Sequence, residues 1–261
     1  MSLVVKDLHF SYGDHQVLSG VSFSLQKGSL VSLLGANGSG KSTLFSCILQ
    51  FLTSYEGNIE LDGINVADLS TKERAEKIAY IPQSHIPVFN FSCLEVVLMA
   101  TQANGSFFHL PGEEDEELAR EMLKRVGLIG FEDRGYSRIS GGERQLVLIA
   151  RALAQGSKFL IMDEPTSSLD YGNQMRILSM IRELANEGYT IFLSTHHPDQ
   201  ALLFADEVIL LHDGKIMAQG KAMEVLTSEN LSTIYSLEID VVPLVNGGMS
   251  TCIPNEVLRE R

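Results

Sequence analysis

The segment Gly35-Ala36-Asn37-Gly38-Ser39-Gly40-Lys41-Ser42 combines small residues with a lysine and a hydroxyl at the spacing Gly-x4-Gly-Lys-Ser/Thr. Glycines let the backbone wrap closely around phosphate oxygens, and the lysine ammonium can reach the β- and γ-phosphates of a nucleotide. A hydroxyl directly after the lysine can bind Mg²⁺. The pattern therefore predicts a nucleoside triphosphate site with Lys41 and Ser42 at its centre.

A second chemical pattern is a pair of carboxylates, Asp163 and Glu164, that follows the apolar run Phe159 to Met162. Neighbouring residues on an extended chain point in opposite directions, so the two acids can take different roles. Asp163 is suited to holding Mg²⁺ or its water shell, and Glu164 to orienting the water that attacks a γ-phosphate. Without a phosphate loop in the same chain, such a pair would more often be a cap or a surface feature.

A third pattern is Ile139-Ser140-Gly141-Gly142-Glu143-Arg144-Gln145, which precedes the apolar helical run Leu146 to Ala154. The serine and the glycines are thus expected at the N-terminus of a helix, where backbone N–H groups favour anions. Ser140 and Glu143 also have the spacing of a capping box, so the string alone is equally compatible with a helix cap.

Strands and helices must position these patterns. We expect three short strands between Leu3 and Leu34, the third over Ser29 to Leu34, and a helix over Ser42 to Leu52. Another helix is expected over Asp170 to Glu187, closed by Gly188. Further strands are predicted at Gly57 to Leu61, Ile78 to Ile81, Phe159 to Met162 and Thr190 to Ser194. This alternation indicates an α/β protein with a mainly parallel sheet covered on both faces.

A helical insertion between β/α units is expected between Gln83 and Ser140, with a capping box at Ser92-x-x-Glu95 and an amphipathic helix over Glu113 to Val126. Ser70-x-x-Glu73 predicts another short helix. In the tail, Val208 to Leu211 and Lys215 to Gln219 read as a hairpin around Asp213-Gly214. Short helices up to about Ser236 and an extended segment should follow it.

Composition limits the class of protein. The chain has 261 residues, of which 44 % are hydrophobic and 20 % charged, which is ordinary globular usage and excludes disordered and fibrous classes. Its net charge of −13 disfavours a dedicated nucleic-acid binder. The three cysteines, Cys47, Cys93 and Cys252, form no Cys-x-x-Cys pair and are expected to be thiols in a reducing compartment. We find no export signal and no apolar run of membrane-spanning length, so we expect other chains to cross any membrane involved.

Together the motifs resemble the ATP-binding-cassette ATPases, whose signature is Leu-Ser-Gly-Gly-Gln. The resemblance covers almost the whole chain, and the motifs follow the family's order. Ile139 and Glu143 replace the commonest Leu and Gln of the signature, whereas Ser140 and both glycines are unchanged. His197 stands where the family usually has Asp. The family also has a switch histidine, which contacts the γ-phosphate and helps to position the catalytic glutamate. Because His196 is expected directly after a strand, the resemblance assigns this role to His196, and His197 is at most an indirect contributor.

The resemblance implies a phosphate-loop NTPase core with an N-terminal antiparallel β subdomain and an inserted α-helical subdomain. It treats residues 1–261 as one nucleotide-binding domain, with the helical subdomain at approximately 84–154 of the RecA-like core and a C-terminal extension at approximately 221–261. The implied catalytic residues are Glu164, His196 and Gln83, and the implied Mg²⁺ ligands are Ser42, Gln83 and Asp163. The residues implied to bind ATP are Tyr12, Gly35, Ala36, Asn37, Gly38, Ser39, Gly40, Lys41, Ser42, Thr43, Ser140, Gly141, Gly142, Glu143 and Asp170.

The resemblance further implies that two ATPase subunits, here a homodimer, pack head to tail. Each ATP would then join one chain's phosphate loop to the other chain's signature. Opening and closing of this dimer would drive transmembrane permease subunits, which place the chain at the cytoplasmic, inner face of the membrane. An extracytoplasmic substrate-binding protein would take part indirectly, and nucleic acid would not. Val88, Phe89 and Phe91 are candidates for the groove that receives a permease helix, or equally for the core.

More narrowly, the stretch Glu164 to Gln174 and the tail Val225 to Leu231 resemble the importer branch that handles iron-siderophore complexes, haem, cobalamin and oxyanions such as molybdate. A non-transport cassette ATPase, such as an iron–sulfur assembly component, stays open as an alternative, as does the ATPase subunit of an exporter. A module that binds ATP without hydrolysing it is disfavoured, because Glu164 and His196 are both present.

Overall fold

The computed structural model describes residues 1–83, 90–101, 111–243 and 250–255. Within this part of the chain the strands form two larger sheets and one hairpin. The antiparallel sheet has the order β2-β1-β4-β5 and consists of β1 (Leu3–Tyr12), β2 (His15–Leu25), β4 (Glu56–Leu61) and β5 (Ile64–Asn65). The second sheet has the order β10-β9-β3-β8-β7-β6 and consists of β3 (Leu30–Leu34), β6 (Ile78–Ile81), β7 (Phe159–Met162), β8 (Thr190–Thr195), β9 (Glu207–His212) and β10 (Lys215–Lys221). The hairpin is formed by β11 (Ile239–Pro243) and β12 (Ser250–Pro254).

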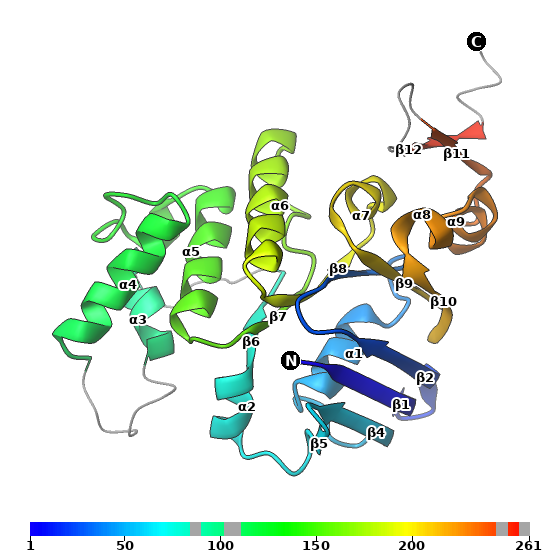
Figure 1. Cartoon of the computed structure of the whole chain (residues 1–261), viewed down its shortest axis with the longest axis horizontal. Coiled ribbons are helices and arrows are strands. Elements are labelled where there is room, and N and C mark those ends of the chain that lie inside the picture. The colour runs from blue at the N-terminus through cyan, green and yellow to red at the C-terminus, as the bar shows by residue number, and fades with distance from the viewer. Residues whose placement is uncertain (84–89, 102–110, 244–249, 256–261) are drawn as a thin grey trace.

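Helices connect and cover these strands (Figure 1). They are α1 (Lys41–Ile48), α2 (Thr71–Lys77), α3 (Cys93–Thr101), α4 (Glu113–Arg125), α5 (Gly141–Ala154), α6 (Tyr171–Asn186), α7 (Pro198–Phe204), α8 (Ala222–Val225) and α9 (Ser228–Tyr235). A short 3₁₀ helix, η2 (Tyr136–Arg138), precedes α5.

The larger sheet is mainly parallel, which confirms the predicted fold class. β6, β7, β8, β3 and β9 pair in parallel, and β10 is antiparallel to β9. All four residues of β7 are buried, and they alternate between two cores. Leu160 and Met162 pack in the core that contains α5 and α6, whereas Phe159 and Ile161 pack in the core that contains α1 and the antiparallel sheet. Burial of both faces explains why these strands read as continuous apolar runs.

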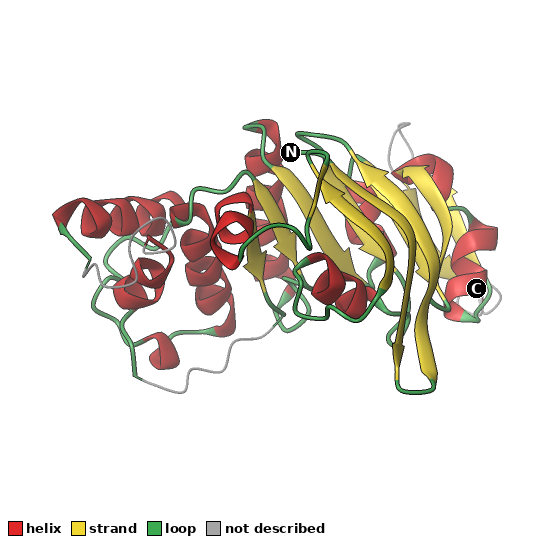
Figure 2. Ribbon diagram, turned by 90° about the horizontal axis from the view of Figure 1, so that it is seen from below, coloured by secondary structure: helices red, strands yellow, loops and turns green. Residues whose placement is uncertain are grey.

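The segment after β6 is helical, as predicted. α3, α4 and α5 pack on one another, and Figure 2 shows them at one end of the molecule, beside the strand-rich part. Reciprocal hydrogen bonds between Ser92 and Glu95 cap α3 as predicted, and the first turn of α4 carries acidic residues, most of them exposed. Phe91 is half-buried and packs against the core. Val88 and Phe89, the other two candidates for a permease groove, lie outside the described residues.

Several element boundaries differ from the sequence-based expectation. α1 ends at Ile48 rather than Leu52, because the chain turns at Gln50, whose φ is +60°. α5 begins at Gly141, before the apolar run Leu146 to Ala154, with Ser140 at the helix N-terminus as predicted. α7 was not predicted, although Pro198 at its first position is a typical start signal. The first two strands are also longer than expected, because register shifts in their pairing interrupt the polar and apolar alternation.

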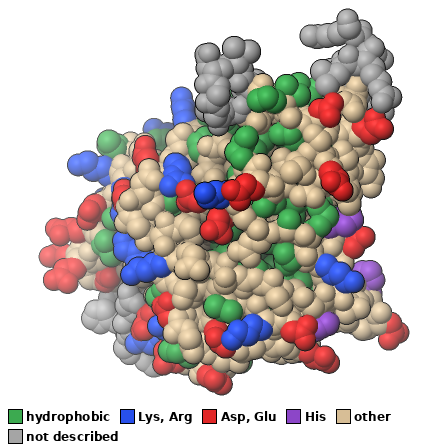
Figure 3. Space-filling model, turned by 45° about the vertical axis from the view of Figure 1, so that its right-hand side comes forward, with side chains coloured by type: hydrophobic (Ala, Val, Ile, Leu, Met, Phe, Trp, Pro, Cys, Tyr) green, Lys and Arg blue, Asp and Glu red, His purple; other side chains and the backbone are tan. Residues whose placement is uncertain are grey.

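The C-terminal part adds a third, smaller core. The predicted hairpin of β9 and β10 is confirmed, and the final extended segment pairs with itself as β11 and β12. Their apolar residues pack with α7, α8 and α9 around Leu210, Leu226 and Leu231. Figure 3 shows this side of the molecule, where acidic side chains are spread over the surface with basic ones among them. In the described parts of the chain, no helix is both long and apolar enough to span a membrane.

Candidate active site

The glycine-rich segment joins β3 to α1 as a tight loop. Gly38 and Gly40 have φ values of +82° and +105°, a region in which other residues are strained. A Cβ atom on Gly35 would lie 2.4 Å from the carbonyl oxygen of Leu211, so only glycine fits there. Gly40 is the N-cap of α1, and no side chain caps this helix. The first N–H groups of α1 are therefore available to an anionic ligand.

Lys41, the first residue of α1, is held inside this loop. Its Nζ donates hydrogen bonds of 2.9 Å to the carbonyl oxygen of Gly35 and 3.2 Å to that of Ala36. The hydroxyl of Ser39 is buried without a hydrogen-bond partner among the described residues. An orphaned buried hydroxyl is costly, and a phosphate oxygen would satisfy it. The loop thus fits a nucleotide phosphate by its charge, its free donors and its backbone shape.

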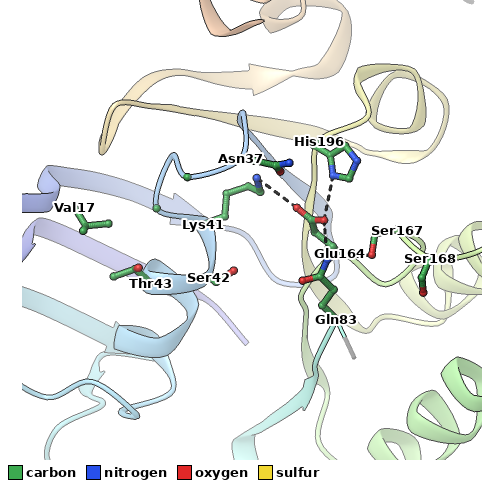
Figure 4. A pocket seen from close by; sticks show the side chains of 12 residues that line it. Val17, Asn37, Lys41, Ser42, Thr43, Gln83, Glu164, Ser167, Ser168 and His196 are labelled. Carbon is green, nitrogen blue, oxygen red and sulfur yellow. Dashed lines mark hydrogen bonds and ion pairs between the residues drawn. The ribbon is translucent and has the colours of Figure 1, made fainter. Parts of the chain in front are cut away.

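Asp163 and Glu164 lie directly after β7, and a single serine fixes both. The hydroxyl of Ser194, at the end of neighbouring β8, donates a 2.6 Å hydrogen bond to Oδ1 of buried Asp163. The Ser194 hydroxyl oxygen in turn accepts a 2.9 Å hydrogen bond from the backbone N–H of Glu164. The φ of Glu164 is +43°, a left-handed conformation that is strained for a residue with a side chain. This turn directs the Glu164 carboxylate into the pocket in front of the phosphate loop (Figure 4).

Three predicted site residues meet at the Glu164 carboxylate. Oε2 lies 3.1 Å from Nδ1 of His196 and accepts a 3.2 Å hydrogen bond from Nε2 of Gln83. Oε1 lies 3.5 Å from Nζ of Lys41. Gln83, Glu164 and His196 follow the parallel strands β6, β7 and β8, whose carboxyl ends share one edge of the sheet. The carboxylate is therefore oriented by neighbours and can accept a proton from a water molecule in the pocket.

The pocket has a volume of about 620 Å³ and is lined by residues from the phosphate loop, the strand ends and β2. Sequence reasoning found most of the lining but missed Val17, Ser167 and Ser168. It also missed Ser194, although a serine at the end of a buried strand next to Asp163 is a usable signal. Tyr12, at the end of β1, is 53 % exposed and is not one of the residues that line this pocket. Its ring packs edge-on against Phe10, with centroids 4.9 Å apart.

The Ser140 motif lies apart from this pocket. Ser140 is the N-cap of α5: its hydroxyl accepts a 3.3 Å hydrogen bond from the Glu143 N–H, and its own N–H donates one of 2.7 Å to Glu143 Oε2. These hydrogen bonds hold the pKa of Glu143 below its usual value. The glutamine that is usual in the family could accept the same hydrogen bond from the Ser140 N–H through its side-chain oxygen. Glutamate and glutamine can therefore both complete this helix cap. Ser140, Gly142 and Glu143 line a second pocket of about 360 Å³.

Asp170 starts the next helix beside this second pocket. Its Oδ1 accepts a 3.0 Å hydrogen bond from the N–H of Asn173, so it caps α6, and this bonding lowers its pKa. Asn173 lines the second pocket, where a Cβ atom on Gly142 would lie 3.1 Å from its Cγ. The N-termini of α5 and α6 are thus adjacent.

His197 stacks on the switch histidine. The two imidazole rings lie 4.1 Å apart between centroids, and burial, followed by the charge of His196, lowers the pKa of His197. Both effects favour the neutral form of the His197 ring, and it is Nδ1 of His196 that contacts Glu164.

Residues 18–167, more than half of the chain, match the model of the ABC transporter family. This chain belongs to the ABC transporter family. It is 36 % identical over 263 residues to the hemin import ATP-binding protein of Jannaschia, covering 97 % of this chain and 94 % of that protein. Membership of this family implies that the chain binds ATP and is an ATPase.

Solved ABC transporter structures resemble the whole chain. One, an inward-facing conformation of a metal-chelate type ABC transporter, superposes with a TM-score of 0.86 at 32 % identity and covers 97 % of both chains. Another, a dimeric bacterial ABC transporter cassette, superposes with a TM-score of 0.74 at 31 % identity, covering 84 % of this chain and 98 % of that one. These similarities confirm the predicted fold and family.

Proposed function

We propose that this chain is the ATP-hydrolysing subunit of an importer, in which ATP binding and hydrolysis drive uptake through transmembrane permease subunits. The observation that carries the proposal is the Glu164 carboxylate, which faces Lys41 while His196 and Gln83 hold it. Similarity over almost the full length to a hemin import protein supports import as the direction of transport. Similarity to a metal-chelate type transporter supports the class of cargo. The proposed cargo is a metal chelate, such as an iron-siderophore, haem or cobalamin, or an oxyanion.

In the proposed reaction, Gly35 to Thr43 bind the triphosphate, and the exposed ring of Tyr12 stacks on adenine. Ser42, Gln83 and Asp163 would hold Mg²⁺, which when bound would neutralise charge on the phosphate oxygens. Within the described ranges, no group of three or more His, Cys, Asp or Glu could hold a metal by itself. A hydroxyl, an amide and one carboxylate nevertheless suit Mg²⁺, because it prefers oxygen ligands and is often held by few protein groups plus substrate phosphates.

Hydrolysis is assigned to Glu164 as the general base. Its carboxylate takes a proton from the attacking water, and His196 and Gln83 keep it aimed at that water through Oε2. Nε2 of Gln83 also donates a 3.2 Å hydrogen bond to the hydroxyl of Ser167, so it contacts two residues of the segment that follows β7. From the family resemblance, we propose that Gln83 also contacts the permease, so that its movement would transmit the nucleotide state.

The catalytic unit is proposed to be a head-to-tail homodimer. Ser140, Gly141 and Gly142 are not residues that line the Lys41 pocket, and they lie with exposed Asp170 around separate helix N-termini. A second copy would bring its signature to this chain's nucleotide, and Asp170 would report across the interface. The existence of a dimeric cassette with the same fold supports this arrangement.

Ser140→Arg should block ATP-dependent dimer closure, because a long cationic side chain would fill the surface that must reach the partner's nucleotide. Nucleotide binding to the monomer should change by less than about twofold, because Ser140 is remote from Lys41. Sedimentation with ATP should show a monomer. Ser70→Arg is the matched control, since it removes an identical capping box from α2 at a cost of about 1 kcal/mol. Normal dimerisation of Ser140→Arg would argue against the proposed interface.

The proposed partners are permease subunits and, through them, an extracytoplasmic substrate-binding protein. This places the chain at the cytoplasmic face of the membrane. Affinity purification of the full-length chain from detergent-solubilised membranes should recover a multi-span membrane protein. Recovery of a stable soluble assembly without one would instead favour a non-transport ATPase. Vesicles that contain the purified complex should accumulate the chelate in the import direction, whereas extrusion would identify an exporter.

A further inference from the structure

The loop that carries His196 is attached to the C-terminal part of the chain. β8 ends at Thr195, so the backbone carbonyl of His196 lies beyond the strand. This carbonyl accepts a 2.8 Å hydrogen bond from the hydroxyl of Tyr235, the last residue of α9. Thirty-nine residues separate the two in sequence. The backbone of the residue whose imidazole contacts Glu164 is therefore bonded to a side chain outside the nucleotide pocket.

Packing and backbone hydrogen bonds hold Tyr235 and its helix in position. Its ring is half-buried and packs against the third core, whose members include Leu231 and Ile234 of the same helix. Burial also raises the pKa of the phenol, so its hydroxyl remains protonated and able to donate. Ser232 and Ser228 of α9 accept hydrogen bonds from the backbone of Ile239 and Val241, both 2.9 Å, and these tie the helix to β11.

A second attachment lies three residues beyond His196. Oδ1 of Asp199, in the first turn of α7, accepts a 2.9 Å hydrogen bond from the N–H of Cys252 and a 3.2 Å hydrogen bond from the hydroxyl of Thr251. Both donors belong to β12. The segment from His196 to Asp199 is thus hydrogen-bonded at both ends to the C-terminal part of the chain.

The same core also reaches the phosphate loop. Leu34, the last residue of β3, is fully buried in the third core, and Ala36 of the loop packs against it. One packed unit therefore supports both walls of the pocket, the side with the phosphate loop and the side with His196.

We propose that Tyr235 is a positioning residue for ATP hydrolysis, which acts by holding the His196 backbone so that the imidazole keeps Glu164 aimed into the pocket. This inference rests on the proposed function of Glu164 and His196. Tyr235 does not line the nucleotide pocket, so it should affect the rate of turnover and not the binding of ATP. Asp199 secures the far end of the same loop.

Tyr235→Phe in the full-length chain tests this, because it removes only the hydroxyl. We expect kcat per nucleotide site to fall about fivefold, the effect of one neutral hydrogen bond, while KM for ATP stays within about twofold. Tyr55→Phe is the matched control: Tyr55 is also half-buried, and its hydroxyl accepts one 2.6 Å hydrogen bond, from Gln50, outside the pocket lining. If Tyr235→Phe and Tyr55→Phe have the same kcat, the proposal is wrong.

A spectroscopic readout separates positioning from general destabilisation and does not need turnover. The imidazole NMR signals of His196, assigned with His196→Gln, should shift in Tyr235→Phe and stay unchanged in Tyr55→Phe. Unchanged His196 signals in Tyr235→Phe would overturn the proposal. If the wild-type chain hydrolysed no ATP, the proposed function would fail, but the shift of these signals would still decide whether Tyr235 positions His196.

Discussion

Glu164→Gln should slow ATP turnover by at least about 100-fold while leaving nucleotide binding intact, because general-base catalysis typically contributes that much. The amide keeps the size of the carboxylate and can still pair with His196 or Gln83, but it cannot take a proton from water. ATP would then remain bound between two chains, and the variant should accumulate as a closed dimer. Phosphate release measures the first effect and sedimentation with ATP the second.

The control for this variant is Glu116→Gln. It removes a carboxylate that pairs with Arg120 at 3.1 Å on the exposed face of α4, away from the pocket. Exposed pairs of this kind contribute little, so its turnover and stability should match those of the unaltered chain. Turnover of Glu164→Gln close to that of the control would remove Glu164 as the base.

Lys41→Ala should weaken ATP binding by at least about 100-fold, because the ammonium supplies charge-assisted hydrogen bonds to the phosphates. Its Nζ lies inside the loop, where it donates hydrogen bonds to the carbonyl oxygens of Gly35 and Ala36 and lies 3.5 Å from Glu164. Alanine is also a good helix former at the start of α1. Titration with a fluorescent ATP analogue measures the loss.

Lys158→Ala is the corresponding control. It removes a lysine whose Nζ lies 3.8 Å from the ring centroid of Tyr189, outside the residues that line the pocket. Its nucleotide affinity should remain unchanged. Thermal unfolding of both variants checks that each is folded, and micromolar ATP affinity in folded Lys41→Ala would contradict the role of the phosphate loop.

Local sequence determined most of the chemistry and the element types. The Gly35 to Ser42 spacing predicted a phosphate loop, and continuous apolar runs such as Phe159 to Met162 predicted buried parallel strands. The capping pattern of Ser140 and Glu143 is likewise present in the structure. Such features are readable because they depend on neighbours within a few residues along the chain. Helix ends were less predictable, as α1 shows, because a single left-handed residue moves them.

The tertiary structure decided how these parts act together. Ser194 fixes Asp163 and Glu164 from 31 and 30 residues away, and Tyr235 holds the His196 backbone from a helix outside the pocket. The left-handed turn at Glu164 is also invisible in the sequence. The separation of Ser140 from Lys41 was implied only by the family resemblance and not by the residues themselves. The physical reason is that these contacts depend on strand order and on packing between distant segments. A sequence specifies which groups are present, but only the folded chain sets which atoms meet.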